Sequence, residues 1–195
     1  MKRSLSNNVK RQAGSAVIEF ALVIVIFAMI ALGTLELARV EYLLNTLGEV
    51  TRRAAAAAAN ADYTDPAAME KVQAEAIFRH ASGPLVHGAP VTADNVKIDY
   101  LSVSKGTWEL NHMSALPGCP AGNRSNCLTD PHAANCIRFV RARICDTMDG
   151  SGNCERLRYE VLFPFIDVSG GKLPTAETIV PVGSLGAAIG AMPCT

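Results

Sequence analysis

Residues 14–35 read G-S-A-V-I-E-F-A-L-V-I-V-I-F-A-M-I-A-L-G-T-L, and between Ala16 and Leu35 only Glu19 carries a charge. About 20 predominantly apolar residues cross a hydrocarbon core of about 30 Å as a helix, so this run is long enough to span a membrane. A carboxylate inside such a run is disfavoured by about 2.5–3.5 kcal/mol at the helix centre. The sequence therefore predicts a partner for Glu19.

A basic leader, Met1–Gly14, precedes the apolar run and contains no acidic residue. Its charges are Lys2, Arg3, Lys10 and Arg11, whereas the chain as a whole has a formal net charge of zero. Positive charge before a membrane span favours retention of that side in the cytoplasm. We therefore expect a cytoplasmic N-terminus, with the bulk of the chain on the other side of the membrane.

The stretch Gly14-Ser15-Ala16-Val17-Ile18-Glu19-Phe20 resembles the processing site of type IV prepilins, and its continuation to Val23 is most similar to TadE-type pseudopilins of tight-adherence (Flp) pilus systems. The resemblance implies that a prepilin peptidase cuts between Gly14 and Ser15. It also implies that Glu19, beside Phe20, pairs with the new α-amino group of a mature N-terminus, commonly that of a neighbouring subunit. Opposite charges attract strongly at low dielectric, so such a pair offsets burial and sets the register between helices.

Two plainer alternatives remain open for this region. A basic leader with an apolar segment is also typical of an ordinary signal anchor or of a cleaved signal peptide. Ordinary signals have an apolar core of about 7–15 residues, followed by a cleavage site of small residues. The run here is longer and continues into a helical pattern, and Ala28–Ala31 makes a poor cleavage site, so we favour the prepilin-like interpretation.

One long helix is predicted from Ser15 to about Asn60, with residues 16–35 in the membrane. Beyond the span, apolar and small residues recur at spacings of three and four, as on one face of a helix. We expect this stripe to pack against the rest of the chain: Leu37, Val40, Leu44, Leu47, Thr51, Ala54 and Ala58. Within the span, small residues let helices of neighbouring subunits approach closely; these are Ala16, Ala21, Ala28, Ala31 and Gly33.

Residues 61–195 are predicted to form an extracytoplasmic α+β head, in which an antiparallel sheet packs on the long helix as in a pilin. Asp65 is placed to cap a second helix that begins at Pro66 and ends near His80. Strands are predicted where apolar and polar residues alternate: Val96–Tyr100, Ile137–Ile144, Leu157–Ile166 and Glu177–Val182, the last an edge strand because of Pro181. Residues 110–135 are expected to be a loop.

All six cysteines follow the apolar run: Cys119, Cys127, Cys136, Cys145, Cys154 and Cys194. An even number confined to the exported part indicates disulfides formed in an oxidising compartment. Cys145 and Cys154 flank a predicted hairpin turn, so they are the first choice for a pair. Cys119 with Cys127 is the second choice, which leaves Cys136 with Cys194. Six cysteines allow 15 connectivities, so the pairing stays open.

The sequence carries no pattern that indicates catalysis, a metal site or nucleic-acid binding. No cysteines have the close spacing that zinc sites use, and no basic patch is interleaved with aromatic residues. The segment Asp146–Glu155 does not fit the pattern of an EF-hand calcium loop and is predicted to be a polar hairpin turn. We expect a protein that is not an enzyme and needs no cofactor or metal.

Two classes of function follow. The resemblance implies a minor pilin or pseudopilin of the bacterial inner membrane with a periplasmic head, which takes part in Flp/Tad pilus assembly and so in adhesion or secretion. Its expected partners are other pilin subunits, prepilin peptidase and the pilus assembly platform. The alternative is a signal-anchored periplasmic or surface binding domain that is not assembled into a filament.

Overall fold

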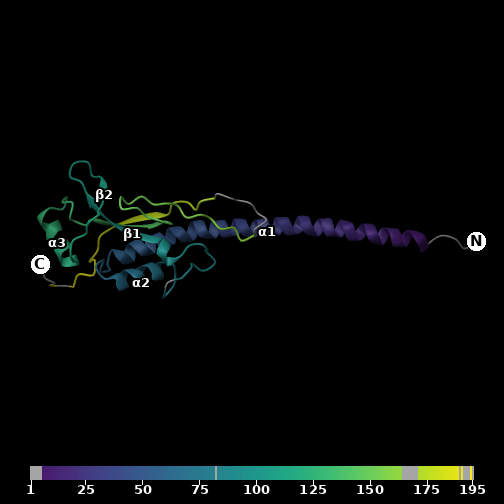
Figure 1. Ribbon diagram of the computed structural model, residues 1–195, viewed down its shortest axis with the longest axis horizontal. Coiled ribbons are helices and arrows are strands. Elements are labelled where there is room, and N and C mark those ends of the chain that lie inside the picture. The colour runs from purple at the N-terminus through teal and green to yellow at the C-terminus, as the bar shows by residue number, and fades with distance from the viewer. Residues whose placement is uncertain (1–5, 82, 164–170, 189, 191–193, 195) are drawn as a thin grey trace, which may run out of the picture. The chain divides into compact units, whose positions relative to one another are not determined.

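The computed structural model describes residues 6–81, 83–163, 171–188, 190 and 194. The chain divides into two compact units, and each is described by itself below. The N-terminal unit comprises Met1–Glu41 and Val161–Asp167, and the head unit comprises Tyr42–Glu160 and Val168–Thr195. Helix α1, drawn in purple and blue in Figure 1, contributes residues to both units.

Helix α1 runs from Ser6 to Ala58, which confirms the predicted long helix and extends it into the leader. It continues through Gly14, Gly33 and Gly48, although glycine costs about 1 kcal/mol relative to alanine inside a helix. Its stretch from Gly14 to Ala58 is long and apolar enough to cross a membrane. The first five residues of the leader lie outside the described part of the chain.

Helix α2 (Pro66–Ala76) begins as predicted. The Asp65 carboxylate accepts a hydrogen bond of 3.0 Å from the Ala67 N–H, and Pro66 occupies the first turn. The helix ends before His80, the predicted boundary, because Phe78 adopts a left-handed backbone conformation with φ of 61°. The Arg79 N–H then bonds back to the Ala74 carbonyl at 2.9 Å, which closes the last turn.

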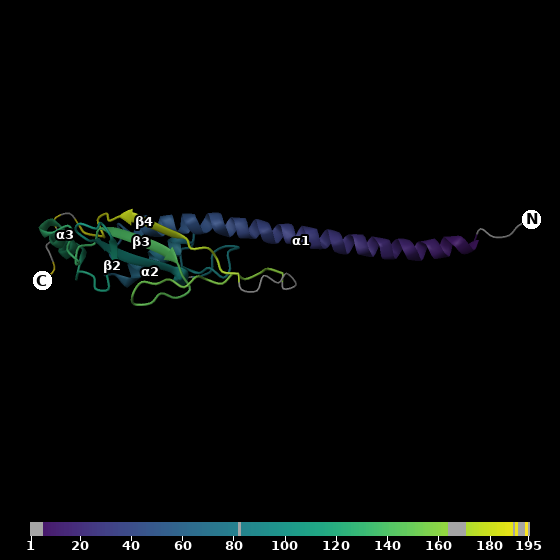
Figure 2. The same ribbon diagram turned by 90° about the horizontal axis from the view of Figure 1, so that it is seen from above.

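Four antiparallel strands form the sheet of the head unit in the order β2-β1-β3-β4. They are β1 (Val96–Val103), β2 (Leu110–His112), β3 (Phe139–Ile144) and β4 (Glu177–Pro181). Figure 2 shows β4 beside β3, with β2 on the other side of the sheet. The α+β class and three of the predicted strands are therefore confirmed, and β4 lies at an edge, where a strand tolerates Pro181.

The predicted strand Leu157–Ile166 is wrong over its described residues 157–163, and residues 164–166 lie outside the described part. The alternation itself holds at its start, because Leu157 is buried and Arg158 is exposed. However, the segment forms an isolated bridge between Arg158 and Lys172 rather than a ladder. Two backbone hydrogen bonds hold the segment to the returning chain: the Tyr159 N–H donates to the Gly171 carbonyl and the Leu173 N–H to the Leu157 carbonyl, both at 2.8 Å.

The segment 110–135 is not the predicted loop, because it contains β2 and helix α3 (Pro120–Thr129). Cys119 caps α3, since its Sγ accepts a hydrogen bond from the Gly122 N–H at 3.3 Å. Pro120 occupies the first turn, where its missing N–H costs nothing. Pro120 and Gly122 therefore lie in the first turn of a helix and not in a loop.

The core of the head unit lies between α1, α2 and one face of the sheet. From α1 it includes Leu43, Leu47, Val50 and Ala54, which pack with Ala76 and Ile77 beside α2 and with Val96, Ala142 and Ile144 of the sheet. The predicted stripe is confirmed at Leu47, Thr51, Ala54 and Ala58, all fully buried. It is wrong at Leu37 and Leu44, which are 61% and 46% exposed, and Val40 is half-buried.

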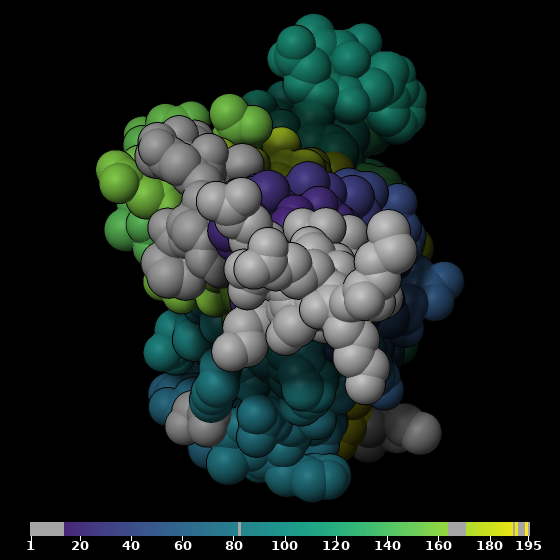
Figure 3. All heavy atoms as spheres, turned by 90° about the vertical axis from the view of Figure 1, so that its right-hand side faces the viewer, coloured from purple at the N-terminus to yellow at the C-terminus, as the bar shows by residue number. Residues whose placement is uncertain are grey.

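The turn between β1 and β2 projects from the sheet, and it appears as the teal knob at the top of Figure 3. Residues 105–110 are all exposed, with the Trp108 side chain 70% exposed. Trp108 has a left-handed backbone with φ of 59°, and its ring meets that of His132 edge-on at 5.2 Å. The turn is closed by the Ser104 N–H, which bonds to the Glu109 carbonyl at 3.0 Å.

Candidate functional site

The prepilin-like motif lies within α1, more than two turns after the helix begins at Ser6. Residues 14–20 are helical, and the Ser15 hydroxyl donates a hydrogen bond of 2.9 Å to Oε1 of Glu19, one turn further on. The Glu19 carboxylate therefore lies on the same side of the helix as residue 15. If the chain began at Ser15, the carboxylate would be one helical turn away from a terminal α-amino group.

The surface of α1 around this motif is apolar and exposed. Val17 is 67% exposed and Phe20 is 68% exposed, and the large apolar side chains that follow are similar. Of the small residues predicted to pack against neighbouring helices, Ala21 and Gly33 are exposed, and Ala28 is half-buried. A Cβ built on Gly14 or Gly33 meets no atom within 4 Å, so these glycines are not required by the fold of this chain.

Comparison with protein families tests the resemblance stated from the sequence. Residues 14–56 match the model of the TadE-like protein family. The resemblance stated from residues 14–23 is therefore confirmed over this TadE-like segment, which begins at Gly14 and stops within the last two turns of α1. Together, the match and the membrane-length helix fit a membrane protein associated with Tad pili. Neither the curated proteins nor the solved structures gave a significant match.

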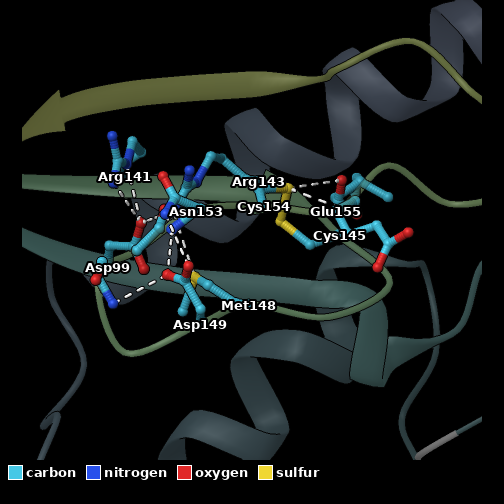
Figure 4. Close-up of polar contacts among 12 residues, drawn as sticks. Asp99, Arg141, Arg143, Cys145, Met148, Asp149, Asn153, Cys154 and Glu155 are labelled. Carbon is cyan, nitrogen blue, oxygen red and sulfur yellow. Dashed lines mark hydrogen bonds and ion pairs between the residues drawn. A yellow bond between two sulfur atoms is a disulfide. The ribbon is translucent and has the colours of Figure 1, made fainter.

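The strands and disulfides of the head unit lie outside the TadE-like segment. Among the described charged residues of this unit, Asp99 is the most buried, at 2% exposure. Figure 4 shows Asp99 on β1 facing two arginines of β3. Its Oδ2 pairs with the Arg141 guanidinium at 2.8 Å and also with that of Arg143. Arg143 further donates to the Gly152 carbonyl at 2.7 Å. The cluster thus fastens the turn after β3 to the sheet.

Asp99 is one of the polar residues in the alternation that predicted β1, and such residues usually face solvent in an antiparallel sheet. Asp99 is only 2% exposed, because the turn after β3 covers that face of the sheet. Register explains its partner, since Asp99 lies directly opposite Arg141 in the ladder. The available signal was the presence of opposite charges on two predicted strands, but their pairing depends on a register that the sequence leaves open.

The segment Asp146–Glu155 is a polar turn, as predicted. Asp149 accepts hydrogen bonds from the backbone N–H groups of Ser151 and Asn153 and from the Asn153 side chain, at 2.9, 2.8 and 2.7 Å. These bonds favour the charged carboxylate and hold the pKa of Asp149 below its ordinary value, the Asn153 side chain contributing most. In the described part of the chain, no three His, Cys, Asp or Glu side chains are grouped to hold a metal ion.

Two tyrosines pack together under α2 and the turn that precedes it. The rings of Tyr63 and Tyr100 lie 5.4 Å apart, and the Tyr63 hydroxyl donates to the Pro117 carbonyl at 3.0 Å. Burial raises the pKa of Tyr63 to about 12, with a further contribution from Asp62. The pKa of Tyr100 is raised further, again mainly by burial. Both hydroxyls therefore stay protonated at physiological pH and serve packing.

The disulfides are Cys119–Cys194, Cys127–Cys136 and Cys145–Cys154. The first predicted pair, Cys145 with Cys154, is confirmed. Cys119 with Cys127 and Cys136 with Cys194 are wrong. Cys119 caps the start of α3 and Cys127 lies near its end, about 12 Å further along at 1.5 Å per residue. That separation exceeds the roughly 7 Å between Cα atoms that a disulfide tolerates.

Sequence reasoning also missed Glu36, which does not belong to the predicted packing stripe. Its carboxylate pairs with Arg39 at 3.7 Å and accepts hydrogen bonds from the backbone N–H of Leu162 at 3.3 and 3.2 Å. All three residues belong to the N-terminal unit. The signal was an acidic residue directly after the apolar run, but its partner lies more than a hundred residues further along the chain.

Proposed function

We propose that the chain is a TadE-like minor pilin or pseudopilin, a non-enzymatic subunit that inserts in the bacterial inner membrane and takes part in Tad pilus assembly. The observation that carries this proposal is the family match that begins at Gly14 and covers the exposed apolar surface of α1. In this proposal prepilin peptidase removes Met1–Gly14 on the cytoplasmic side. The head then lies in the periplasm, and residues 16–35 span the bilayer.

The proposed chemistry of assembly rests on Glu19. After cleavage, Ser15 carries an α-amino group, and Glu19 lies one turn away, within 2.9 Å of the Ser15 hydroxyl in the present chain. Pairing of Glu19 with an amine, on its own or a neighbouring subunit, compensates a carboxylate that is otherwise disfavoured in the membrane. Ala21 and Gly33, both exposed, support this arrangement because small residues allow close approach between helices.

The first experiment is to determine the N-terminal residue of the protein purified from membranes, with and without an active prepilin peptidase. We expect a chain that starts at Ser15 only when the peptidase is active. A chain that starts at Met1 in both cases would contradict the proposal and favour the signal-anchored binding domain. A start beyond Ala31 would indicate a cleaved signal and a free, disulfide-bonded protein.

Variants at Gly14 test recognition by the peptidase separately from folding. A Cβ at Gly14 meets no atom within 4 Å, so Gly14→Val leaves the rest of the chain undisturbed. We expect uncleaved protein that still inserts in the membrane. Unchanged cleavage of this variant would show that the peptidase does not read this position, contrary to the proposed site.

Glu19→Gln tests assembly, because it removes the charge and keeps the size of the side chain. We expect membrane insertion with loss of incorporation into pili or pilus-assembly complexes. Glu49→Gln is the matched control on the same helix, since Glu49 pairs with Arg52 at the surface, outside the span. Equal assembly of both variants would count against the proposed role of Glu19.

A further inference from the structure

Glu36 occupies an unusual position on α1. Among residues 14–42 it alone is buried, at 6% exposure, and its neighbours Leu35 and Leu37 are 57% and 61% exposed. A buried carboxylate is unfavourable unless hydrogen bonds and opposite charge compensate it. Glu36 has both, from the Leu162 N–H and from Arg39. The contact therefore holds the segment Val161–Phe163 to the helix directly after its apolar run.

The covered strip on α1 continues from Glu36 towards the N-terminus. Ala28 and Leu32, which share a helix face with Glu36 at spacings of four, are half-buried, as is Ala31. Ala21, also on α1, is exposed. Ala28 precedes Glu36 by eight residues, which is about 12 Å along the axis at 1.5 Å per residue. Covering of the helix therefore reaches into the length of the predicted span.

The segment bound to Glu36 is itself apolar. Val161, Leu162 and Phe163 follow one another without a charge, and Leu162 keeps its side chain 58% exposed although its backbone N–H is bound to Glu36. If residues 16–35 fill the hydrocarbon core of about 30 Å, Glu36 lies at its outer boundary. The Leu162 side chain is then held at the depth where acyl chains begin.

We propose that Val161–Phe163 is a second membrane contact, which inserts the Leu162 side chain among the acyl chains of the outer leaflet beside α1. The occupant is lipid because the segment is uncharged, projects an exposed leucine, and is bound to the helix beside the exposed Leu35 and Leu37. Glu36 is a positioning residue, which holds the segment at this depth. The inference rests on the proposed membrane insertion of α1.

The test uses the full chain in phosphatidylcholine vesicles that contain lipids with a nitroxide near the carboxyl end of the acyl chain. All six native cysteines are in disulfides, so Leu162→Cys provides a unique thiol for an environment-sensitive fluorophore. Val25→Cys, within the span, is the positive control. Leu128→Cys, 79% exposed on α3, is the negative control. We expect the blue shift at position 162 to be intermediate between the two controls. Its quenching should be at least as strong as at position 25, because a nitroxide near the carboxyl end lies at the depth proposed for residue 162 and not at the bilayer centre.

The controls separate the two proposals. Quenching at position 25 but not at 162 would overturn the second membrane contact and leave the membrane insertion of α1 intact. Absence of quenching at both positions would overturn both. A third outcome is a blue shift at position 162 that grows with the ratio of protein to lipid, without quenching by the nitroxide lipids. It would identify a second copy of the chain as the occupant and would also overturn the proposal.

Two variants of Glu36 test its positioning role in the Leu162→Cys background. Glu36→Ala removes the acceptor for the Leu162 N–H, and we expect a loss of quenching at position 162 with unchanged quenching at position 25. Glu36→Gln keeps an acceptor oxygen and is expected to restore most of the quenching. Equal quenching in both variants and in the parent would show that the contact with Glu36 does not position the segment.

Discussion

The two parts of helix α1 place their apolar side chains in different ways. In the N-terminal unit, Val17, Phe20 and Leu37 are more than half exposed. In the head unit, Leu43, Leu47 and Val50 are fully buried on one stripe. A single helix therefore carries a surface suited to lipid or neighbouring helices and a surface suited to its own sheet. The apolar content of the sequence does not distinguish these two surfaces. The charged residues that reappear after Leu35 do distinguish them.

The largest expected effect concerns the head unit, where covalent bonds supplement a small core. Replacing Cys119 and Cys194 by serine opens a loop with a sequence separation of 75. Chain entropy predicts a loss of about 4.5 kcal/mol in the free energy of unfolding for a loop of that size. The measurement is urea unfolding of the full chain in mild detergent, followed by near-ultraviolet circular dichroism of the packed tyrosines.

The matched control is the pair Cys145 and Cys154, whose separation is nine. The same relation predicts a loss of about 2.5 kcal/mol when this shorter loop is opened. Equal losses for the two double variants would show that loop length does not determine the contribution of these disulfides. Neither variant is expected to change insertion of the apolar half of α1 into vesicles.

The second effect distinguishes two leucines that lie about one turn apart on α1, Leu47 inside the buried stripe and Leu44 outside it. Leu47→Ala removes a fully buried side chain and is expected to cost about 2–5 kcal/mol, because it leaves a cavity. Leu44→Ala, at a site 46% exposed, is expected to cost less than about 1 kcal/mol. Unfolding in mild detergent measures both, and a larger loss for Leu44→Ala would contradict the observed stripe.

The third predicted effect is the loss of stability when a single hydrogen bond between α1 and β4 is removed. The hydroxyls of Thr51 and Thr178 lie 2.9 Å apart. Thr178→Val keeps the shape and removes this partner, for an expected loss of about 1 kcal/mol in unfolding free energy. Thr107→Val, in the exposed turn between β1 and β2, is the control and is expected to change little. Similar losses of unfolding free energy for the two variants would show that this hydrogen bond does not contribute to stability.

The smallest effect is a dependence on pH. The folded pKa of Asp149 is lowered by its bonds to the turn. Its stabilising contribution is therefore present above the unfolded pKa and is lost as the pH falls through the folded pKa. Asp149→Asn cannot titrate, so its melting temperature should fall less than that of the parent between about pH 5 and pH 2. Asp94→Asn, another exposed carboxylate, is the control, and identical slopes for all three proteins would contradict the assignment.

The features predictable from sequence were local. The apolar run, the cap at Asp65 and the edge position of β4 each depend on residues close together in the chain, and the structure has all three. The buried stripe was predicted one position away at Leu44 instead of Leu43. Successive residues differ by about 100° around a helix, so an error of one position replaces a residue that faces the core by one on the side of the helix. The sequence offered apolar residues at both positions and no means of choosing between them.

The features missed from sequence depend on contacts between distant residues. Asp99 is buried because Arg141 and Arg143 face it from another strand. Glu36 is buried because Leu162 returns to α1. Two disulfides were mispaired because α3, unrecognised in the predicted loop, separates Cys119 from Cys127. In each case the residue types were visible in the sequence, but the folding of a distant segment decided their role.

The bond between Cys119 and Cys194 also has a mechanical consequence. It encloses β3, β4 and the other two disulfides in one covalent ring with a sequence separation of 75. An extended chain spans about 3.3–3.6 Å per residue, so roughly 250 Å of chain lies inside the ring and cannot be extended while the disulfide is intact. A pull between α1 and the C-terminal end passes from residue 119 straight to residue 194, and the strands inside the ring carry no covalent load.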